Sequence, residues 1–221
     1  MEKRRDSATA YIILADGFET IEALTPLDVL RRCGVEVTTI SLNQTRAVRS
    51  SHGVTVEADA TMEDFMHNCN CSASGTGTGT STSNAGTSSS AGSSTTASST
   101  VHQALILPGG YPGYKNLCDS PEVGALITQF HKEGKLLCAI CGAPTALKAN
   151  QICRGAAITC HTSVKEELSD YYSILSSAVV KYMNIITGMG AGRSLDFAFA
   201  IAEALTSKEK VEEIKAKMEI I

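Results

Sequence analysis

The segment Lys135–Ala149, KLLCAICGAPTALKA, constrains the fold of this chain more than any other. Its apolar half, Leu136–Ile140, is typical of a short strand that is buried on both faces. Small or conformationally restricted residues follow at Cys141–Pro144, and a strand needs such residues to turn sharply into a helix. The segment therefore predicts a strand, a tight turn with Cys141 at its apex, and a helix.

Cys141 is the first candidate functional residue because a turn of this kind exposes the side chain at its apex. The unpaired N–H groups of the following helix, with their partial positive charge, stabilise a thiolate there. We therefore expect the pKa of Cys141 to lie below the usual value of about 8.5, so that the thiol is mostly ionised at neutral pH. The arrangement is a nucleophile elbow with sulfur in place of the serine oxygen. The alternative is a buried, inert cysteine, and the small neighbours Gly142 and Ala143 favour the reactive one.

The first forty residues predict a parallel sheet. Tyr11–Ala15 and Val35–Ser41 are typical of buried strands, and the residues between them show apolar side chains at helical spacing. Glu22 lies in the first turn of this helix, and Pro26 falls near its start, where proline is tolerated. A strand, a helix and a second strand in this order indicate a parallel sheet with right-handed connections.

The rest of the chain continues the alternation of strands and helices. The glycines of the loop Pro108–Gly113 allow backbone N–H groups to approach a ligand closely. Ser120 is placed to cap a helix that Gly134 ends. The further predicted elements are a hairpin or an edge extension of the sheet over 46–57, helices over Met62–His67, Pro121–Glu133, Leu195–Leu205 and Lys208–Met218, and strands over Ala104–Leu107, Ala156–Thr159 and Ile185–Thr187.

Residues 72–100 interrupt this pattern. Every residue of this segment is Ser, Thr, Gly or Ala except Asn84. It cannot bury enough apolar area to offset the entropy of ordering it, so we expect a disordered loop. Because strands and helices resume directly afterwards, we expect an insertion within one domain that spans residues 1–221 rather than a linker between two domains.

Composition excludes several classes of protein. A net charge of −4 and a pI near 5.7 give no electrostatic footprint for nucleic acid, and no apolar run is long enough to span a membrane. The first ten residues are polar and include Glu2 and Asp6, unlike a signal or transit peptide, so we expect a cytoplasmic protein. The eight cysteines match no zinc spacing, and the lone pair Cys69 and Cys71 is weak support for a metal site. We expect neither a metal nor a cofactor.

Five segments together resemble the DJ-1 (ThiJ/PfpI) superfamily, and most closely its DJ-1/ThiJ branch. The resemblance covers nearly all of the chain except the Ser/Thr/Gly insertion. It implies a flavodoxin-like α/β fold, a three-layer sandwich with a mostly parallel sheet, which is usually a homodimer. The segments are ILADGFETIEALTPLDVLRRCGVEVT, LILPGGYPGYKNL, LLCAICGAPTAL, AITCHTSVKEEL and GRSLDFAFAIAEAL.

The resemblance also implies a site around Cys141. It pairs this cysteine with Glu22 from the first helix, assigns oxyanion donors to the backbone N–H groups of Gly110 and Gly142, and brings His161 near the sulfur. Glu22 as a mere helix-start residue and His161 as a structural histidine remain open alternatives. In the protease branch a histidine follows the nucleophile directly; Gly142 stands there, so a Cys–His dyad of that kind cannot form. The DJ-1 branch commonly has a small residue, Gly and Pro after the cysteine, whereas this chain has Gly142-Ala143-Pro144.

Three functions follow from this pairing. The resemblance favours a cysteine-dependent, glutathione-independent glyoxalase or deglycase that acts on methylglyoxal or on early glycation adducts, in defence against carbonyl and oxidative stress. A carboxyl group beside a thiolate has a raised pKa, so Glu22 can move protons between adjacent carbons of a carbonyl substrate. The second function is a redox sensor in which Cys141 is oxidised to a sulfinic acid. The third is a chaperone or interaction protein in which Cys141 is incidental, or a chaperone that is redox-regulated.

Overall fold

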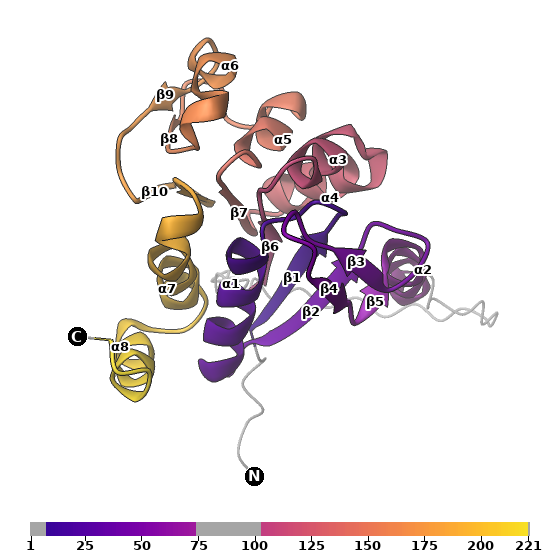
Figure 1. Ribbon diagram of the computed structural model, residues 1–221, viewed down its shortest axis with the longest axis horizontal. Coiled ribbons are helices and arrows are strands. Elements are labelled where there is room, and N and C mark those ends of the chain that lie inside the picture. Colours follow the sequence, from indigo (N-terminus) through magenta and orange to yellow (C-terminus); the bar gives the residue numbers. More distant parts are fainter. Residues whose placement is uncertain (1–7, 74–102, 221) are drawn as a thin grey trace, which may run out of the picture.

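The computed structural model describes residues 8–73 and 103–220, and its centre is a seven-stranded sheet (Figure 1). The strand order is β10-β11-β7-β6-β1-β2-β5. All neighbouring strands are parallel except β10 and β11, which are antiparallel. The strands are β1 (Thr9–Leu14), β2 (Glu36–Ser41), β5 (Ala60–Thr61), β6 (Gln103–Leu107), β7 (Leu136–Ile140), β10 (Val179–Tyr182) and β11 (Ile185–Gly188).

Helices cover both faces of this sheet (Figure 1). One face packs against α1 (Thr20–Arg32), α7 (Ser194–Leu205) and α8 (Lys208–Lys217). The opposite face packs against four other helices, and the result is the predicted three-layer α/β sandwich with a mostly parallel sheet. These four are α2 (Met62–Ala73), α3 (Gly113–Asp119), α4 (Pro121–Lys132) and α5 (Pro144–Ala149).

Apolar side chains on both faces explain why the central strands carry continuous apolar runs. Ile12 and Ile13 are neighbours in β1, and their side chains belong to the cores on opposite faces of the sheet. Cys138 and Ala139 of β7 divide in the same way. A strand that is covered on both faces has no solvent-exposed face, so polar residues do not alternate with apolar ones along it. The continuous apolar runs of the sequence show this pattern.

Several elements differ from the sequence prediction. The predicted loop Pro108–Gly113 leads directly into the helix α3, and this helix was not predicted. The strand predicted over Ala156–Thr159 is shorter, and as β8 (Ala157–Ile158) it pairs with β9 (Ser173–Ile174) in a small separate sheet. The edge strand β10 was also missed. The hairpin predicted over 46–57 is confirmed as β3 (Ala47–Arg49) and β4 (Thr55–Glu57).

Two helices also need correction. Pro26 lies inside α1 rather than near its start, so it cannot donate a backbone hydrogen bond to the carbonyl group of Glu22 four residues earlier. The helix predicted over Met62–His67 continues through Ala73 as α2, which includes the first two residues of the predicted insertion. The rest of that insertion, residues 74–100, lies outside the described residues, and the single-domain organisation of the chain stays a prediction.

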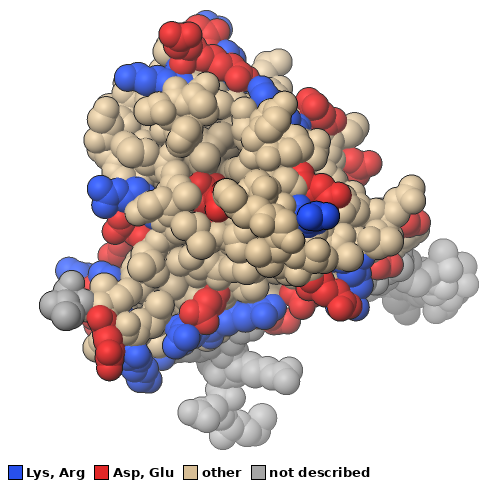
Figure 2. Space-filling model, viewed as in Figure 1, with Lys and Arg blue, Asp and Glu red and all other residues tan. Residues whose placement is uncertain are grey.

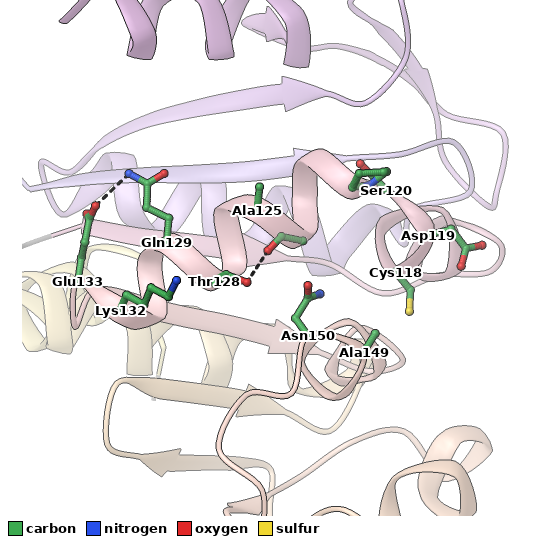
Figure 3. A pocket seen from close by; sticks show the side chains of 12 residues that line it. Cys118, Asp119, Ser120, Ala125, Thr128, Gln129, Lys132, Glu133, Ala149 and Asn150 are labelled. Carbon is green, nitrogen blue, oxygen red and sulfur yellow. Dashed lines mark hydrogen bonds between the residues drawn. The ribbon is translucent and has the colours of Figure 1, made fainter. Parts of the chain in front are cut away.

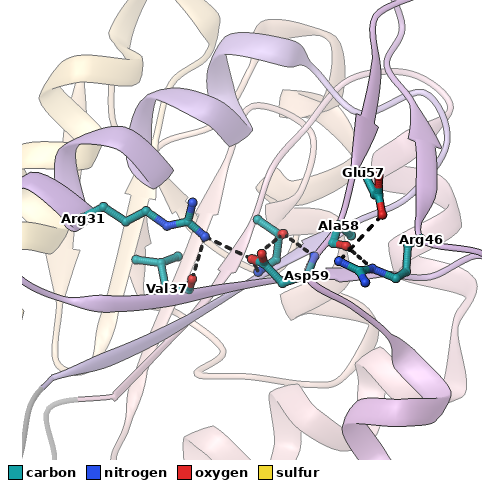
Figure 4. Close-up of polar contacts among 7 residues, drawn as sticks. Arg31, Val37, Arg46, Glu57, Ala58 and Asp59 are labelled. Atoms are coloured by element: carbon teal, nitrogen blue, oxygen red, sulfur yellow. Dashed lines mark hydrogen bonds and ion pairs between the residues drawn. The ribbon is translucent and has the colours of Figure 1, made fainter.

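A group of polar contacts centred on Asp59 fastens the hairpin to the edge of the sheet (Figure 4). The Asp59 carboxylate accepts hydrogen bonds from the backbone N and the Oγ1 of Thr39, both at 2.8 Å, and from Arg31 Nη2 at 3.1 Å. Arg31 also donates to the carbonyl oxygen of Val37, and Arg46 Nε donates to that of Ala58. The end of α1, the edge of β2 and the chain that leaves the hairpin are therefore joined.

None of the helices in the described residues is both long enough and apolar enough to cross a lipid bilayer.

Candidate active site

The predicted site residues gather at the carboxyl ends of three neighbouring strands. The chain leaves β1 for β2 on one side and returns to β6 on the other side, so the strand order reverses between β1 and β6. Ligands of open α/β sheets bind at such a reversal, outside the carboxyl ends of the strands. Glu22 follows β1, Gly110 follows β6, and Cys141 follows β7.

Cys141 occupies the predicted turn between β7 and α5. Its φ is 66°, which lies in the left-handed region that residues with a side chain rarely adopt. Its backbone N donates to Gly188 O at 3.0 Å, and the N of Ala143 donates to Ile140 O at 3.0 Å. These bonds hold the strained residue in place, and such strain is typical of functional sites.

Glu22 presents its carboxyl group to Cys141 from inside the protein. The residue is 0% exposed, and its Oε2 accepts a hydrogen bond from the backbone N of Gly109 at 2.8 Å. The carboxyl group also lies within hydrogen-bonding reach of the Cys141 thiol, while Oε1 has no partner. Burial raises the pKa of Glu22 to about 7, against the opposing effect of those two hydrogen bonds. The sequence analysis predicted this raised pKa.

The pKa of Cys141 differs from the sequence prediction. Burial, followed by the negative charge of Glu22, raises this pKa to about 12. The backbone N–H groups of Gly110 and Gly142 form hydrogen bonds to the sulfur and act in the opposite direction, but they do not compensate. The predicted lowering was therefore wrong, because α5 has only six residues and the sulfur is half-buried beside a carboxyl group. A pKa this high leaves the Cys141 thiol protonated at neutral pH.

Gly110 and Gly142 lie where the sequence analysis placed them, with their amides directed at the Cys141 sulfur. Gly110 has a φ of 90°, and a Cβ there would lie 2.3 Å from the backbone N of Glu19. The function of these amides as oxyanion donors stays a prediction. The sequence analysis missed Gly109, whose Cβ would lie 2.6 Å from both Cys141 Cβ and Glu22 Oε2. The adjacent glycines after β6 were the available signal, because only glycine fits between the two reacting groups.

His161 reaches the site through its backbone. Its N–H donates to the carbonyl oxygen of Cys141 at 2.9 Å. The exposed imidazole turns to its own chain, where Nδ1 accepts from the backbone N of Ser163 at 3.2 Å and lies 2.8 Å from its Oγ. The ring therefore caps the short helix Thr162–Val164, which is the structural alternative left open above. A catalytic function of His161 stays a prediction.

A separate groove of about 740 Å³ lies between α3, α4 and α5 (Figure 3). Lys132 and Asn150 border it, and none of the predicted site residues does. Among the residues whose side chains are described, no three His, Cys, Asp or Glu side chains form a group that could hold a metal ion. The groups gathered around Cys141 are a thiol, a carboxyl group and backbone amides.

Comparison with known proteins places this site in a family. The DJ-1/PfpI family model matches residues 8–204. The dj-1beta protein of Drosophila melanogaster is 32% identical over 209 residues, which cover 94% of this chain and 95% of the relative. Its crystal structure has a TM-score of 0.79 at 31% identity and covers 97% of this chain and 99% of its own. A glutathione-independent glyoxalase of Caenorhabditis elegans is 28% identical over 204 residues, or 91% of each chain. The chain therefore belongs to the DJ-1/PfpI family.

Proposed function

We propose that the protein is a glutathione-independent glyoxalase or deglycase that acts on methylglyoxal or on early glycation adducts. One observation carries this proposal: a buried carboxyl group with a pKa of about 7 lies in hydrogen-bonding reach of an elbow cysteine. A general acid and base works best when its pKa is near the operating pH. The relative from Caenorhabditis elegans that carries the name of this activity supports the same choice.

The first step is addition of the Cys141 sulfur to the aldehyde carbon of methylglyoxal. Glu22 takes the thiol proton, the S–C bond forms, and the electron pair of the carbonyl bond moves to oxygen. Gly110 and Gly142 direct their N–H groups at the sulfur, so the new oxyanion lies beside two hydrogen-bond donors. Glu22 then gives its proton to the oxyanion, which completes a hemithioacetal and leaves Glu22 ionised for the next step.

The second step moves a proton between neighbouring carbons. Glu22 removes the proton from the carbon that carries sulfur and delivers it to the ketone oxygen, which gives an enediol. It then takes the proton of the hydroxyl group on the carbon that carries sulfur and delivers it to the adjacent carbon, so that the former ketone becomes an alcohol. The former aldehyde carbon is now a thioester. Water then cleaves the S–C bond, which releases lactate and restores the thiol. Methylglyoxal and one water are thus converted to lactate, with no external oxidant or reductant.

A redox sensor is the second candidate, and the unpartnered Oε1 of Glu22 favours it. Two equivalents of peroxide convert a thiolate first to a sulfenic and then to a sulfinic acid. Because the pKa of Glu22 is about 7, a protonated carboxyl group is available to donate a hydrogen bond to the new sulfinate oxygen.

Lactate formation from methylglyoxal without glutathione tests the first candidate. The wild-type protein should form lactate and Cys141→Ala should not. Glu22→Gln should lower the rate of lactate formation about a hundredfold or more, the usual contribution of a positioned acid and base. Cys118→Ala is the matched control, because Cys118 is also half-buried but borders the groove of Figure 3. If Cys141→Ala still produces lactate, the glyoxalase proposal is wrong. The same proteins, weighed intact after mild peroxide treatment, show whether Glu22→Gln changes sulfinic acid formation instead.

We also propose that two copies of this cytoplasmic chain associate through the start of α1 and the β3–β4 hairpin. Ile21 and Val54 are 48% and 46% exposed there, and Ser51 N donates to Phe18 O, so the hairpin lies against α1. The face that shows these elements carries its charged side chains mainly along the rim (Figure 2). Ile21→Asp should convert a dimer to a monomer in light scattering, whereas Leu175→Asp, at a residue 41% exposed elsewhere, should not. A wild-type monomer refutes this proposal.

A further inference from the structure

Tyr114 lies directly against the elbow that carries Cys141. A Cβ placed on Gly142 would come within 2.7 to 2.9 Å of three ring atoms of Tyr114, namely Cδ1, Cγ and Cε1. The ring therefore contacts the backbone of the residue whose N–H bonds the Cys141 sulfur. No substituent on Gly142 fits in that space while the ring stays where it is.

Tyr114 is also bonded to the residue that supplies the second N–H group at the sulfur. It is the second residue of α3, and its backbone N donates to the carbonyl oxygen of Gly110 at 2.9 Å. The N–H of Gly110 is the other donor directed at Cys141. One residue thus contacts both of the glycines whose N–H groups face the sulfur, through its backbone on one side and its ring on the other.

The neighbours of Tyr114 limit the movement of its ring. Lys115 places its Nζ 5.3 Å from the ring centroid and forms an ion pair with Glu167 at 3.4 Å. The exposed ring of Tyr111 lies 6.3 Å from it, centroid to centroid. These contacts favour one orientation of the tyrosine, in which it presses on Gly142.

The contact also accounts for the residue order in the elbow. The sequence has Gly142-Ala143-Pro144 where the DJ-1 branch commonly has a small residue, Gly and Pro. With the Tyr114 ring at this distance, position 142 accepts only glycine, and the side chain of Ala143 is instead buried in the core. The carbonyl oxygen of this peptide unit, that of Cys141, accepts a hydrogen bond from the N–H of His161, and the Tyr114 ring packs against the same unit at Gly142. Both contacts restrict the direction of the Gly142 N–H.

We infer that Tyr114 is a positioning residue that holds the amides of Gly110 and Gly142 toward the reacting sulfur and the oxyanion formed beside it. The part about the oxyanion rests on the proposed function. The part about the sulfur does not, because the same amides stabilise a thiolate in any reaction of Cys141. Tyr114 itself neither donates nor accepts a proton in this scheme.

Two readouts test the inference on the full-length protein: the pH midpoint of Cys141 alkylation by iodoacetamide, and kcat and KM for methylglyoxal. Tyr114→Ala should raise the midpoint by at least half a pH unit and lower kcat about tenfold or more, with little change in KM, since misplaced donors weaken the transition state. Tyr114→Phe keeps the ring and should match wild type. Tyr171→Ala is the control, because it removes another partly buried tyrosine from the same core, far along the chain. It should lower the melting temperature without moving the midpoint.

A double-mutant cycle removes the ambiguity of a poorly folded variant. Gly142→Ala alone forces a methyl group against the ring and should raise the alkylation midpoint, and adding Tyr114→Ala should restore part of that shift. Strictly additive shifts, or an unchanged midpoint in Tyr114→Ala, overturn the inference. If wild type forms no lactate, the proposed function fails while the alkylation midpoints still decide the function of Tyr114.

Discussion

Glu22→Gln should change the pH dependence of stability in a way that reports directly on the buried carboxyl group. The pKa of this group is raised from 4.5 to about 7 in the folded protein, chiefly by burial. Between these two values the unfolded chain releases the Glu22 proton and the folded chain retains it. The wild-type protein therefore loses stability as the pH rises from 4.5 to about 7, and above that the full loss is present.

The size of this loss follows from the shift. Each pKa unit corresponds to about 1.4 kcal/mol, so the interval from 4.5 to about 7 gives about 3 kcal/mol. The glutamine of the variant has no proton to lose, and its side-chain oxygen can still accept the hydrogen bond from Gly109 N that Glu22 Oε2 accepts. Between pH 4 and pH 8, the free energy of unfolding of the variant should therefore rise by about 3 kcal/mol relative to that of wild type.

Urea unfolding followed by circular dichroism at pH 4, 5, 6, 7 and 8 measures this difference. The control is Glu36→Gln, which removes an exposed carboxylate at the start of β2, away from the site, and should leave the shape of the curve nearly unchanged. If the free energies of unfolding of wild type and Glu22→Gln stay parallel from pH 4 to pH 8, the carboxyl group has an ordinary pKa. In that case Glu22 cannot serve as the base that the buried thiol requires.

Three further predictions concern the rest of the molecule. Iodoacetamide at pH 7 should label Cys141 before Cys118 and Cys153, the other half-buried cysteines of the described residues. Burial and Glu22 raise the pKa of Cys141, but only this thiol has a carboxyl group beside it that can take its proton as the new S–C bond forms. Peptide mass mapping that finds either of the other two labelled first contradicts this. Replacing residues 74–100 by a short turn should leave the melting temperature and the rate of Cys141 labelling unchanged. A large fall in either quantity contradicts the prediction that this segment is a disordered insertion. Asp59→Asn should lower the free energy of unfolding at pH 7 by about 1 kcal/mol, because the contacts of Arg31 and Thr39 weaken. Those contacts lower the pKa of Asp59 against the opposing effect of burial, so the difference should shrink as the pH falls below 3.8, and a constant difference down to pH 3 excludes this explanation.

The sequence predicted the layers of the fold well because its strongest signals are local. The apolar runs of β1, β6 and β7 and the capping serine before α4 each act within a few residues. Short elements were lost for the same reason. α3 begins at a glycine that directly follows a proline, a pair typical of turns. β10 is an edge strand of only four residues, and the two-residue turn Met183-Asn184 that joins it to β11 lacks the glycine that usually marks such a hairpin.

For the site, the sequence predicts which residues come together but not the pKa of the cysteine among them. The resemblance to a family named Glu22, Gly110, Gly142 and Cys141, and the structure brings all four together. The pKa of Cys141 was predicted with the wrong sign, because it depends on the depth of burial and on a carboxyl group more than a hundred residues away in the chain. No local pattern carries either quantity. The contact of Tyr114 with Gly142 escaped for the same reason.

The place where the chain leaves α2 and re-enters β6 has a consequence for how such a protein can change over evolutionary time. Gln103 lies at the amino-terminal end of β6, whereas Cys141 and Glu22 lie beyond the carboxyl-terminal ends of the parallel strands. Residues added between Ala73 and Gln103 therefore join the sheet at the strand ends that take no part in the proposed reaction. A change in the length of that segment therefore leaves the strand ends that carry Cys141 and Glu22 untouched.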